Sequence, residues 1–257
     1  MPLSHSLLRS LLRRKGRREH GLFLLEGHSL LEEALNSDLE ILEVRATPEA
    51  ADVMRGLLEA AAKRGAVIAE ESERQLERLS DVESSPGIVA VGRIDTQPLT
   101  DVLASQGLVL LLAGVSDPGN AGTLVRTAEA FGAAGVVFGE GGVEPYNPKV
   151  VRGAMGSLFR LPHAVAGTED FLAAAAAAGR PIIAADRSGE PLRAFVFPEN
   201  PIVAVGSERG GVGAWLPSWD AGVAIPHAGP TESLNAAVAG AIVLYEWSLR
   251  ARFFAQN

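Results

Sequence analysis

Apolar residues in the second half of the chain occur in short continuous runs. These runs cover residues 108–115, 135–138, 181–185, 202–205 and 222–225. Continuous aliphatic runs are typical of strands that are covered on both faces, as in parallel sheets. Helical patterns separate them around residues 121–131, 148–158 and 169–178, and a last one follows residue 234. The pattern predicts a five-stranded, largely parallel sheet with helices on both faces.

The first part of the chain shows the same alternation with shorter elements. Strand patterns cover residues 22–25, 39–44, 66–69 and 87–91, and helical patterns cover residues 28–35, 48–64 and 72–79. Alternating strands and helices of this length predict a small α/β domain at residues 1–94. Residues 95–106 lack the strand pattern and are the predicted linker. Within them, residues 102–104 favour a short helix. The second domain is therefore expected to span residues 107–257.

The last helical pattern follows a polar loop and carries an apolar stripe. The stripe consists of Leu234, Val238, Ala241, Ile242, Tyr245 and Leu249. Residues at this spacing share one helix face, so we expect that face to be buried. Thr231, Glu232 and Ser233 offer capping side chains at the start of the helix. An ordinary capped helix that packs on a sheet explains this stretch without any function.

Composition indicates a folded protein without metal or disulfide chemistry. Hydrophobic residues make up 47% of the chain, and no run reaches the roughly 18 consecutive apolar residues of a membrane span. Arg9, Arg13 and Arg14 occupy the place where a signal peptide has its apolar core, so we expect a cytoplasmic protein. The chain has no cysteine, and its histidines form no paired zinc motif. We therefore expect neither a metal site nor a membrane partner.

Charge is distributed unevenly along the chain. The net charge is -8, yet residues 1–20 are strongly basic. A solvated helix face and a patch that binds phosphate groups both explain such a run. The candidates for polyanion contacts are Arg13, Arg14, Lys15, Arg17 and Arg18.

Three polar or glycine-rich loops follow predicted strands of the second domain. They cover residues 116–122, 206–213 and 226–235. In open α/β sheets, ligands bind beyond the carboxyl ends of the strands, so these loops are the candidate site. Asn120 is the expected N-cap of the helix after the first loop. Arg126 falls on the side of that helix opposite its apolar stripe, where a solvated arginine and a functional one are both plausible.

The loop at 206–213 does not fit the common nucleotide-binding patterns. Its sequence GSERGGVG has neither the lysine and hydroxyl residue of a Walker loop nor the spacing of a dinucleotide fingerprint. Its glycines still allow close approach of the backbone to a flat ligand beside the Glu208 carboxylate, although a structural turn explains them equally. Ser233 in the third loop lies in no nucleophile elbow, which leaves a hydrolase served by His227 as a weak alternative.

Taken together, the three loops resemble the three motifs of the SpoU branch of the SPOUT RNA methyltransferases. The first reads NAGTLVRT from Asn120, the second VGSERGG from Val205, and the third IPHAGPTESLN from Ile225. The resemblance covers residues 108–249. The N-terminal stretch RRKGRREHGLFLLEG is similar to the L30e-like substrate-binding domain attached to ribosomal RNA 2'-O-methyltransferases. The implied fold is an L30e-like α/β domain followed by an α/β-knot domain with a mostly parallel sheet and a trefoil knot.

The resemblance implies an S-adenosylmethionine-dependent enzyme that methylates a ribose 2'-hydroxyl, preferably in 23S-type ribosomal RNA. It also implies a homodimer formed through the catalytic domain, which gives the apolar stripe of the last helix a second candidate partner. The implied catalytic positions are Asn120, Arg126, Glu208, Ser233 and Asn235. The implied cofactor positions are Gly206, Ser207, Gly211, Ile225, Pro226 and Leu234. A tRNA substrate and a non-catalytic RNA-binding assembly factor remain alternatives.

The roles of Arg126 and His227 do not follow from the motifs alone. The motif-one arginine is proposed as the base in this family, but a guanidinium pKa above about 12 makes it a poor proton acceptor. We therefore interpret Arg126 as a clamp for a substrate phosphate, with the proton acceptor left open. His227 stands where many members of the family have a hydrophobic residue, so its role is also open.

Overall fold

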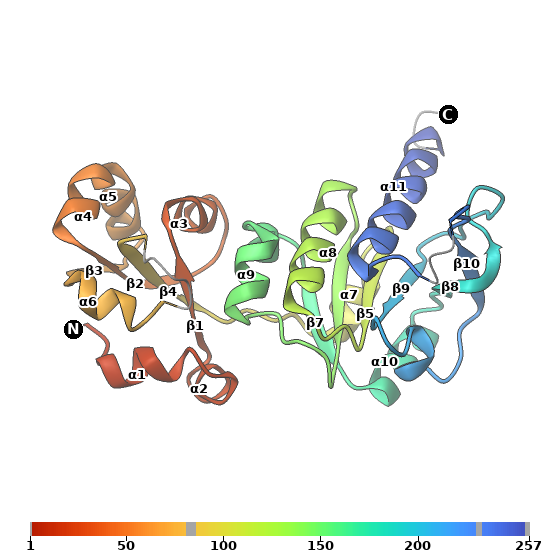
Figure 1. The fold of residues 1–257 in the computed structure, drawn as a ribbon, viewed down its shortest axis with the longest axis horizontal. Coiled ribbons are helices and arrows are strands. Elements are labelled where there is room, and N and C mark those ends of the chain that lie inside the picture. Colours follow the sequence, from red (N-terminus) through yellow and green to blue (C-terminus); the bar gives the residue numbers. More distant parts are fainter. Residues whose placement is uncertain (1, 81–85, 230–232, 255–257) are drawn as a thin grey trace. The chain divides into compact units, whose positions relative to one another are not determined.

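The structure is a computed structural model and describes residues 2–80, 86–229 and 233–254 (Figure 1). The chain divides into two compact units, and each is treated by itself. The first unit comprises Met1–Asp95 and Tyr146–Arg160, and the second comprises Thr96–Pro145 and Leu161–Asn257. The segment Tyr146–Arg160 lies in the first unit although the sequence pattern places it within the second domain.

The first unit is built on a four-stranded sheet with the order β1-β4-β2-β3. Its elements are α1 (His5–Ser10), α2 (Arg14–His20), β1 (Leu22–Glu26), α3 (His28–Leu35), β2 (Ile41–Ala46), α4 (Pro48–Val53), α5 (Arg55–Lys63), β3 (Val67–Glu70), α6 (Glu73–Glu77), β4 (Ile88–Arg93), α9 (Pro148–Ala154) and a 3-10 turn, η1 (Ser157–Phe159). Strand β4 pairs antiparallel with β1 and β2, and β2 pairs parallel with β3. The predicted alternation of strands and helices is present, but the helix expected at 48–64 is broken at Met54.

Aromatic packing explains why the segment Tyr146–Arg160 joins the first unit. The fully buried ring of Phe23 on β1 lies 4.6 Å from the Tyr146 ring and 6.0 Å from the Phe159 ring, measured between centroids. The Tyr146 hydroxyl donates to the Asp95 carbonyl at 2.8 Å and accepts from the Asp95 amide at 3.0 Å. Burial raises the pKa of this hydroxyl far above its ordinary value, because the charged phenolate would be deprived of water.

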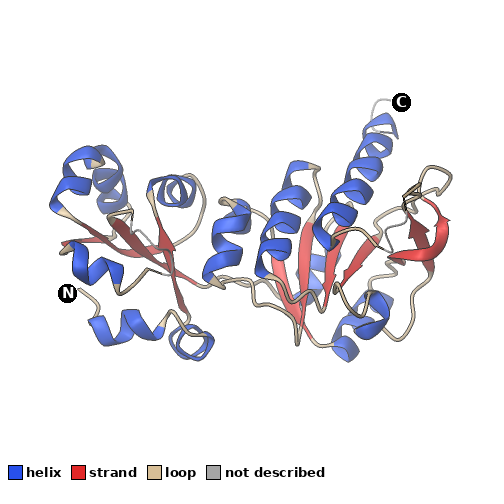
Figure 2. Cartoon of the chain, in the orientation of Figure 1, coloured by secondary structure: helices blue, strands red, loops and turns tan. Residues whose placement is uncertain are grey.

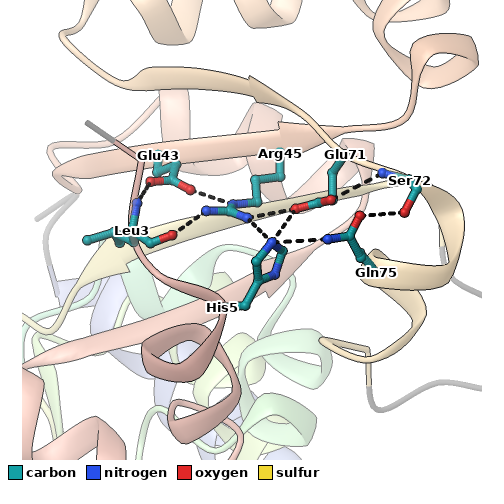
Figure 3. A network of polar contacts seen from close by, with 7 residues as sticks. All are labelled: Leu3, His5, Glu43, Arg45, Glu71, Ser72 and Gln75. Carbon is teal, nitrogen blue, oxygen red and sulfur yellow. Dashed lines mark hydrogen bonds and ion pairs between the residues drawn. The ribbon is translucent and has the colours of Figure 1, made fainter.

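A buried polar network ties residues 3–5 to the sheet of the first unit (Figure 3). Arg45 on β2 is 5% exposed, and its guanidinium lies 2.5 Å from the Glu43 carboxylate and 2.7 Å from that of Glu71. The same guanidinium donates to the Leu3 carbonyl, and the Leu3 amide donates to Glu43 at 2.6 Å. His5 contacts Glu71 at 3.2 Å. Hydrogen bonds to charged groups are roughly twice as strong as neutral ones, so the two bonds of the Leu3 backbone anchor this segment to the sheet.

The second unit is built on a parallel sheet, whose strands are drawn in red in Figure 2. The sheet has six strands in the order β10-β8-β9-β5-β6-β7. Its elements are α7 (Leu99–Ala104), β5 (Val109–Ala113), α8 (Pro118–Ala130), β6 (Gly135–Gly139), β7 (His163–Ala166), α10 (Thr168–Ala177), β8 (Ile182–Pro191), β9 (Ile202–Gly206), a 3-10 turn, η2 (Val212–Ala214), β10 (Ala221–Ala224) and α11 (Ala236–Phe254). The five predicted strands are present. The prediction missed β7, a short edge strand that begins with His163 and leaves Val165 41% exposed.

Helices cover both faces of this sheet, as predicted. Helices α7 and α10 share a core with Val109, Leu111 and Ala113 of β5. Successive residues of a strand point to opposite faces, so the intervening residues of β5 point to the other face. Helices α8 and α11 contact each other and also contact β6 and β9, respectively. Gly240 allows this close packing, because a Cβ atom there would come within 2.3 Å of the Leu124 side chain.

Helix α11 buries a different face from the one that the sequence predicts. The predicted stripe is substantially exposed, with relative exposures of 49%, 36%, 50% and 40% at Val238, Ile242, Tyr245 and Leu249. The buried face instead carries Ala236, Ala237, Val243, Leu244 and Ser248. The helix carries apolar residues on more than one of its sides. Their spacing is therefore consistent with two buried faces and cannot show which of them packs on the sheet. None of the helices in the described ranges is long and apolar enough to cross a membrane.

Candidate functional site

Strand β8, the loops after β9 and β10 and the start of α11 line a cavity of about 260 Å³ in the second unit. Five of the predicted cofactor positions line it, namely Gly206, Ser207, Gly211, Ile225 and Leu234. Pro226 is not among the described lining residues. Of the predicted catalytic positions, Glu208 and Ser233 line the cavity directly. The structure thus brings the second and third motifs to one place, at the carboxyl ends of β9 and β10, the two strands that flank β8 in the sheet.

Close backbone packing shapes the loop after β9. The Gly211 amide donates to the Ser207 carbonyl at 2.9 Å and closes the turn. Gly211 has a φ of 60°, in the region that favours glycine. At Gly206 a Cβ atom would lie 2.0 Å from the Gly211 carbonyl carbon. Gly206 and Gly211 are therefore required by the shape of this loop, and both line the cavity.

A chain of side-chain hydrogen bonds joins the three motifs. The Asn235 Oδ1 atom accepts from the Ala237 amide at 2.9 Å and from the Val238 amide at 3.2 Å. This fixes the Asn235 amide group so that its Nδ2 donates to Asn120 Oδ1 at 2.9 Å. Asn120 in turn donates from Nδ2 to Glu208. Residues that are far apart in the sequence thus form one ordered cluster beside the cavity.

The helix starts around the site differ from the predicted ones. Helix α8 begins at Pro118, and its N-cap is Asp117, whose carboxylate accepts from the Asn120 amide at 2.7 Å. The prediction of Asn120 as the N-cap is therefore wrong, and its side chain is available for the cluster. Asn235, rather than Ser233, caps α11 with its side chain. Thr231 and Glu232, which were also predicted to cap this helix, lie outside the described residues.

Arg126 lies apart from the cavity. It is exposed on α8 and is not among the described residues that line the cavity. Within the described ranges, no hydrogen bond or ion pair engages its guanidinium. As predicted, Arg126 lies off the buried stripe of its helix and has no role in the core. The side chain is thus available to a ligand that approaches from outside.

Three charged or titratable side chains of the cavity were not predicted as site residues. These are Asp186 and Arg187 in the middle of β8 and His227 after β10. Ser188 donates to Asp186 Oδ1 from its hydroxyl at 2.5 Å and from its amide at 2.8 Å. These hydrogen bonds hold the pKa of the Asp186 carboxyl below its ordinary value, so the carboxylate is charged at neutral pH. In the sequence, the signal that could have identified Asp186 and Arg187 is their position directly after the aliphatic run 181–185.

The basic segment of the first unit divides into exposed and buried side chains. Arg13, Arg14, Lys15 and Arg18 are exposed. Arg17 is only 3% exposed, and it donates to the Leu11 carbonyl at 2.7 Å. Its guanidinium connects α2 to the end of α1, so the prediction that Arg17 is a surface contact for RNA is corrected. A charge run in the sequence does not distinguish such a structural arginine from its neighbours.

The described residues contain no cluster of three or more histidine, aspartate or glutamate side chains that would hold a metal ion. The carboxylates of the cavity, Asp186 and Glu208, instead bond to Ser188 and Asn120. The arrangement can hold a ligand against backbone and apolar groups and present it to fixed polar side chains.

Comparisons with known proteins agree with this geometry. Residues 107–245 match the SpoU rRNA Methylase family, and residues 7–90 match the MRM3-like substrate binding domain. The chain is 32% identical to the 23S rRNA (guanosine(2553)-2'-O)-methyltransferase RlmP of Bacillus subtilis over 234 residues, which is 90% of each protein.

Solved structures of similar proteins include bound cofactor. The AdoMet-bound rRNA methyltransferase from Sinorhizobium meliloti matches with a TM-score of 0.85 and 29% identity, over 96% of this chain and 94% of that one. The SpoU methyltransferase AviRb from Streptomyces viridochromogenes, in complex with AdoMet, matches with a TM-score of 0.83 and 28% identity, over 98% and 99%. These findings confirm the predicted α/β fold class and the family to which the motifs pointed. The chain belongs to the SpoU rRNA methylase family.

Proposed function

We propose that the chain is an S-adenosylmethionine-dependent methyltransferase that acts on a ribose 2'-hydroxyl of 23S-type ribosomal RNA. The observation that carries this proposal is the cluster of Asn120, Glu208 and Asn235, which joins all three motifs beside one cavity. The name of the relative RlmP and the AdoMet complex of AviRb support the substrate and the cofactor. Action on ribosomal RNA would place the enzyme in the cytoplasm.

The residues of the cavity fit this cofactor. Apolar groups of Val205, Ile225 and Leu234 suit the adenine ring, and the loop from Gly206 offers backbone atoms for hydrogen bonds. The carboxylates of Asp186 and Glu208 add negative charge, which suits a ligand that carries a sulfonium and an ammonium group. When bound, S-adenosylmethionine supplies a methyl group that is already activated by the positive sulfur.

The remaining side chains would position the RNA. A ribose 2'-hydroxyl is a weak nucleophile, so the enzyme must hold it in line with the methyl group. Ser233 and the cluster of Asn120, Glu208 and Asn235 are placed to orient the ribose or to hold the cavity in shape. Arg126 would bind a substrate phosphate as a bidentate clamp, a task that suits its planar guanidinium.

Methyl transfer from tritiated S-adenosylmethionine tests the proposed function. Purified protein is incubated separately with 23S rRNA and with tRNA from a strain that lacks the gene. We expect label in 23S rRNA, at a nucleotide that becomes resistant to alkaline cleavage on its 3' side, as 2'-O-methylation requires. Label in tRNA alone would select the tRNA alternative. Binding of RNA without any transfer would select the non-catalytic assembly factor.

The exposed basic residues of the first unit are the proposed RNA contacts. We expect the combined charge reversal of Arg13, Arg14, Lys15 and Arg18 to glutamate to weaken RNA binding. Each lost phosphate contact also reduces the dependence of log K on log salt by about one, because fewer counterions are released. Fluorescence anisotropy across a series of salt concentrations measures both effects. Reversal of the exposed Arg55, Lys63, Arg74 and Arg78 in the same unit is the control, because it changes the net charge by the same amount. An unchanged dependence of log K on log salt would show that the segment is an ordinary solvent-exposed face and does not contact RNA.

The exposed stripe of α11 is the proposed homodimer interface of the second unit. Val238, Ile242, Tyr245 and Leu249 form a continuous apolar helix face, which is typical of surfaces that bind a partner. We expect Ile242→Glu combined with Leu249→Glu to produce a folded monomer, because a charge buried in an apolar interface is strongly unfavourable. Sedimentation velocity measures the change. Val53→Glu, at a position 84% exposed on α4, is the control and should leave the dimer intact. A doubly substituted protein that still sediments as a dimer would exclude this surface.

We also propose that the second unit carries the trefoil knot of the family. Membership of the SpoU rRNA methylase family supports this proposal.

A further inference from the structure

Strand β8 departs from regular pairing where it borders the cavity. In its ladder with β10, Ala184 lies opposite Gly222, whereas the next residue of β10, Val223, lies opposite Glu190. Residues 185–189 therefore form a bulge between the two paired stretches. The pairing of β8 with β9 also ends at Ala184. Bulges are common beside active sites, where they redirect side chains.

The bulge has a fixed shape. A Cβ atom at Gly189 would lie 2.2 Å from the Gly222 carbonyl carbon, so the bulge closes tightly against β10. The Ser188 hydroxyl and amide donate to Asp186 Oδ1 at 2.5 Å and 2.8 Å. Both bonds use the same oxygen, and no hydrogen bond within the described residues occupies Asp186 Oδ2. The carboxylate is thus held in place with one oxygen available to a ligand.

Two opposite charges of this bulge border the cavity. The described lining residues include one guanidinium and two carboxylates, those of Arg187, Asp186 and Glu208. Glu208 already accepts from Asn120 and belongs to the cluster that joins the motifs. Arg187 is exposed and makes no hydrogen bond within the described ranges, and its charge acts on the neighbouring Asp186 carboxylate. Asp186 and Arg187 can therefore both bind a ligand that carries charges of both signs.

We propose that Asp186 and Arg187 bind the amino-acid end of S-adenosylmethionine, which rests on the proposed methyltransferase function. The Asp186 carboxylate accepts from the ammonium group, and the Arg187 guanidinium donates to the carboxylate. An α-amino acid carries both charged groups on one carbon atom, so adjacent side chains of opposite charge match it. The apolar lining of the cavity is left for the adenine ring. Binding of both ends of the cofactor orients the methyl group that lies between them.

Two ligands that differ only in the amino-acid end test the assignment. S-adenosylhomocysteine and 5'-methylthioadenosine share the adenosine and a neutral sulfur, but the second lacks the ammonium and carboxylate groups. Asp186→Asn keeps Oδ1 as the acceptor for Ser188 and removes the charge. We expect its affinity for S-adenosylhomocysteine to fall about tenfold or more, as the loss of a hydrogen bond between charged groups predicts. Its affinity for 5'-methylthioadenosine, also measured by calorimetry, should change less than about twofold.

Decarboxylated S-adenosylmethionine separates the roles of the two residues, because it keeps the ammonium group and lacks the carboxylate. Arg187→Gln should bind S-adenosylmethionine about fivefold more weakly, a smaller effect because this side chain is exposed to solvent. It should bind the decarboxylated ligand as the wild type does, whereas Asp186→Asn should weaken both. Glu190→Gln, at an exposed position of β8 outside the described lining residues, is the matched control and should leave every affinity unchanged.

The outcomes separate this inference from the proposed function. Equal losses of S-adenosylhomocysteine and 5'-methylthioadenosine in Asp186→Asn would overturn the assignment, because the residue would then act on the adenosine part or on the shape of the bulge. If both variants bind S-adenosylhomocysteine as the wild type does, the inference fails and the proposed function stands. If the wild type binds neither S-adenosylmethionine nor S-adenosylhomocysteine, both fail. Should thermal unfolding show that Asp186→Asn does not fold, the exposed Arg187→Gln decides, and an unchanged affinity for S-adenosylhomocysteine in that variant would overturn the assignment.

Discussion

Replacement of Arg126 by alanine is expected to lower the rate of methyl transfer by about three orders of magnitude. The guanidinium is exposed and unengaged within the described residues, so it is available to bind a phosphate of the RNA. Loss of a bidentate clamp removes both the attraction and the alignment of the nucleophile. Affinity for S-adenosylmethionine should stay within a few-fold, because Arg126 is not among the described lining residues of the cavity. Single-turnover kinetics and calorimetric titration measure the two quantities.

Two further variants identify the cause of such a loss. Arg126→Lys keeps the charge but lacks the planar fork, so an intermediate rate would support bidentate phosphate binding. Thr123→Ala changes an exposed side chain on the same helix and should leave the rate unchanged. A rate near that of the wild type in Arg126→Ala would remove Arg126 from the mechanism. A matching loss of cofactor affinity would instead mean that Arg126 supports the cavity.

Much of the fold follows from the sequence because parallel strands buried on both faces need continuous aliphatic runs. This signal identifies five strands of the second unit, and it is absent from β7, an edge strand with an exposed Val165. The orientation of α11 could not be predicted, since the helix is apolar on more than one side. The place of Tyr146 in the first unit depends on its contact with Phe23, which no local pattern reveals.

The site was predictable where the loop shape itself restricts the residue type. Gly206, Gly211 and the polar motif residues stand out in the sequence, and the structure places them around one cavity and one hydrogen-bonded cluster. Asn120 was misassigned as a cap because Asp117 and Pro118 form an equally good helix start. Asp186 belongs to no recognised motif. Its position in the cavity follows from the pairing of β8 with β10, which the sequence does not reveal.

The second large effect concerns Gly206, where we expect Gly206→Ala to reduce the affinity for S-adenosylmethionine by about two orders of magnitude, or about 2.7 kcal/mol. An alanine Cβ atom would lie 2.0 Å from the Gly211 carbonyl carbon and 2.1 Å from the Val212 nitrogen. Both atoms belong to the backbone, so no side-chain rotation relieves the clash. The loop must open, which separates the walls of the cavity and moves Glu208 away from Asn120.

Gly213→Ala is the matched control, because it adds the same methyl group to the same loop region. A Cβ atom at Gly213 would meet only the Trp219 ring, at 3.8 Å, which is an ordinary contact. Calorimetric titration with the cofactor and thermal unfolding of both variants separate a local effect on the loop from a global loss of stability. Gly206→Ala should remain folded at low temperature and bind weakly, whereas Gly213→Ala should bind as the wild type does. Wild-type affinity in Gly206→Ala would show that the cofactor does not depend on this loop, and the site would then have to be sought elsewhere in the second unit.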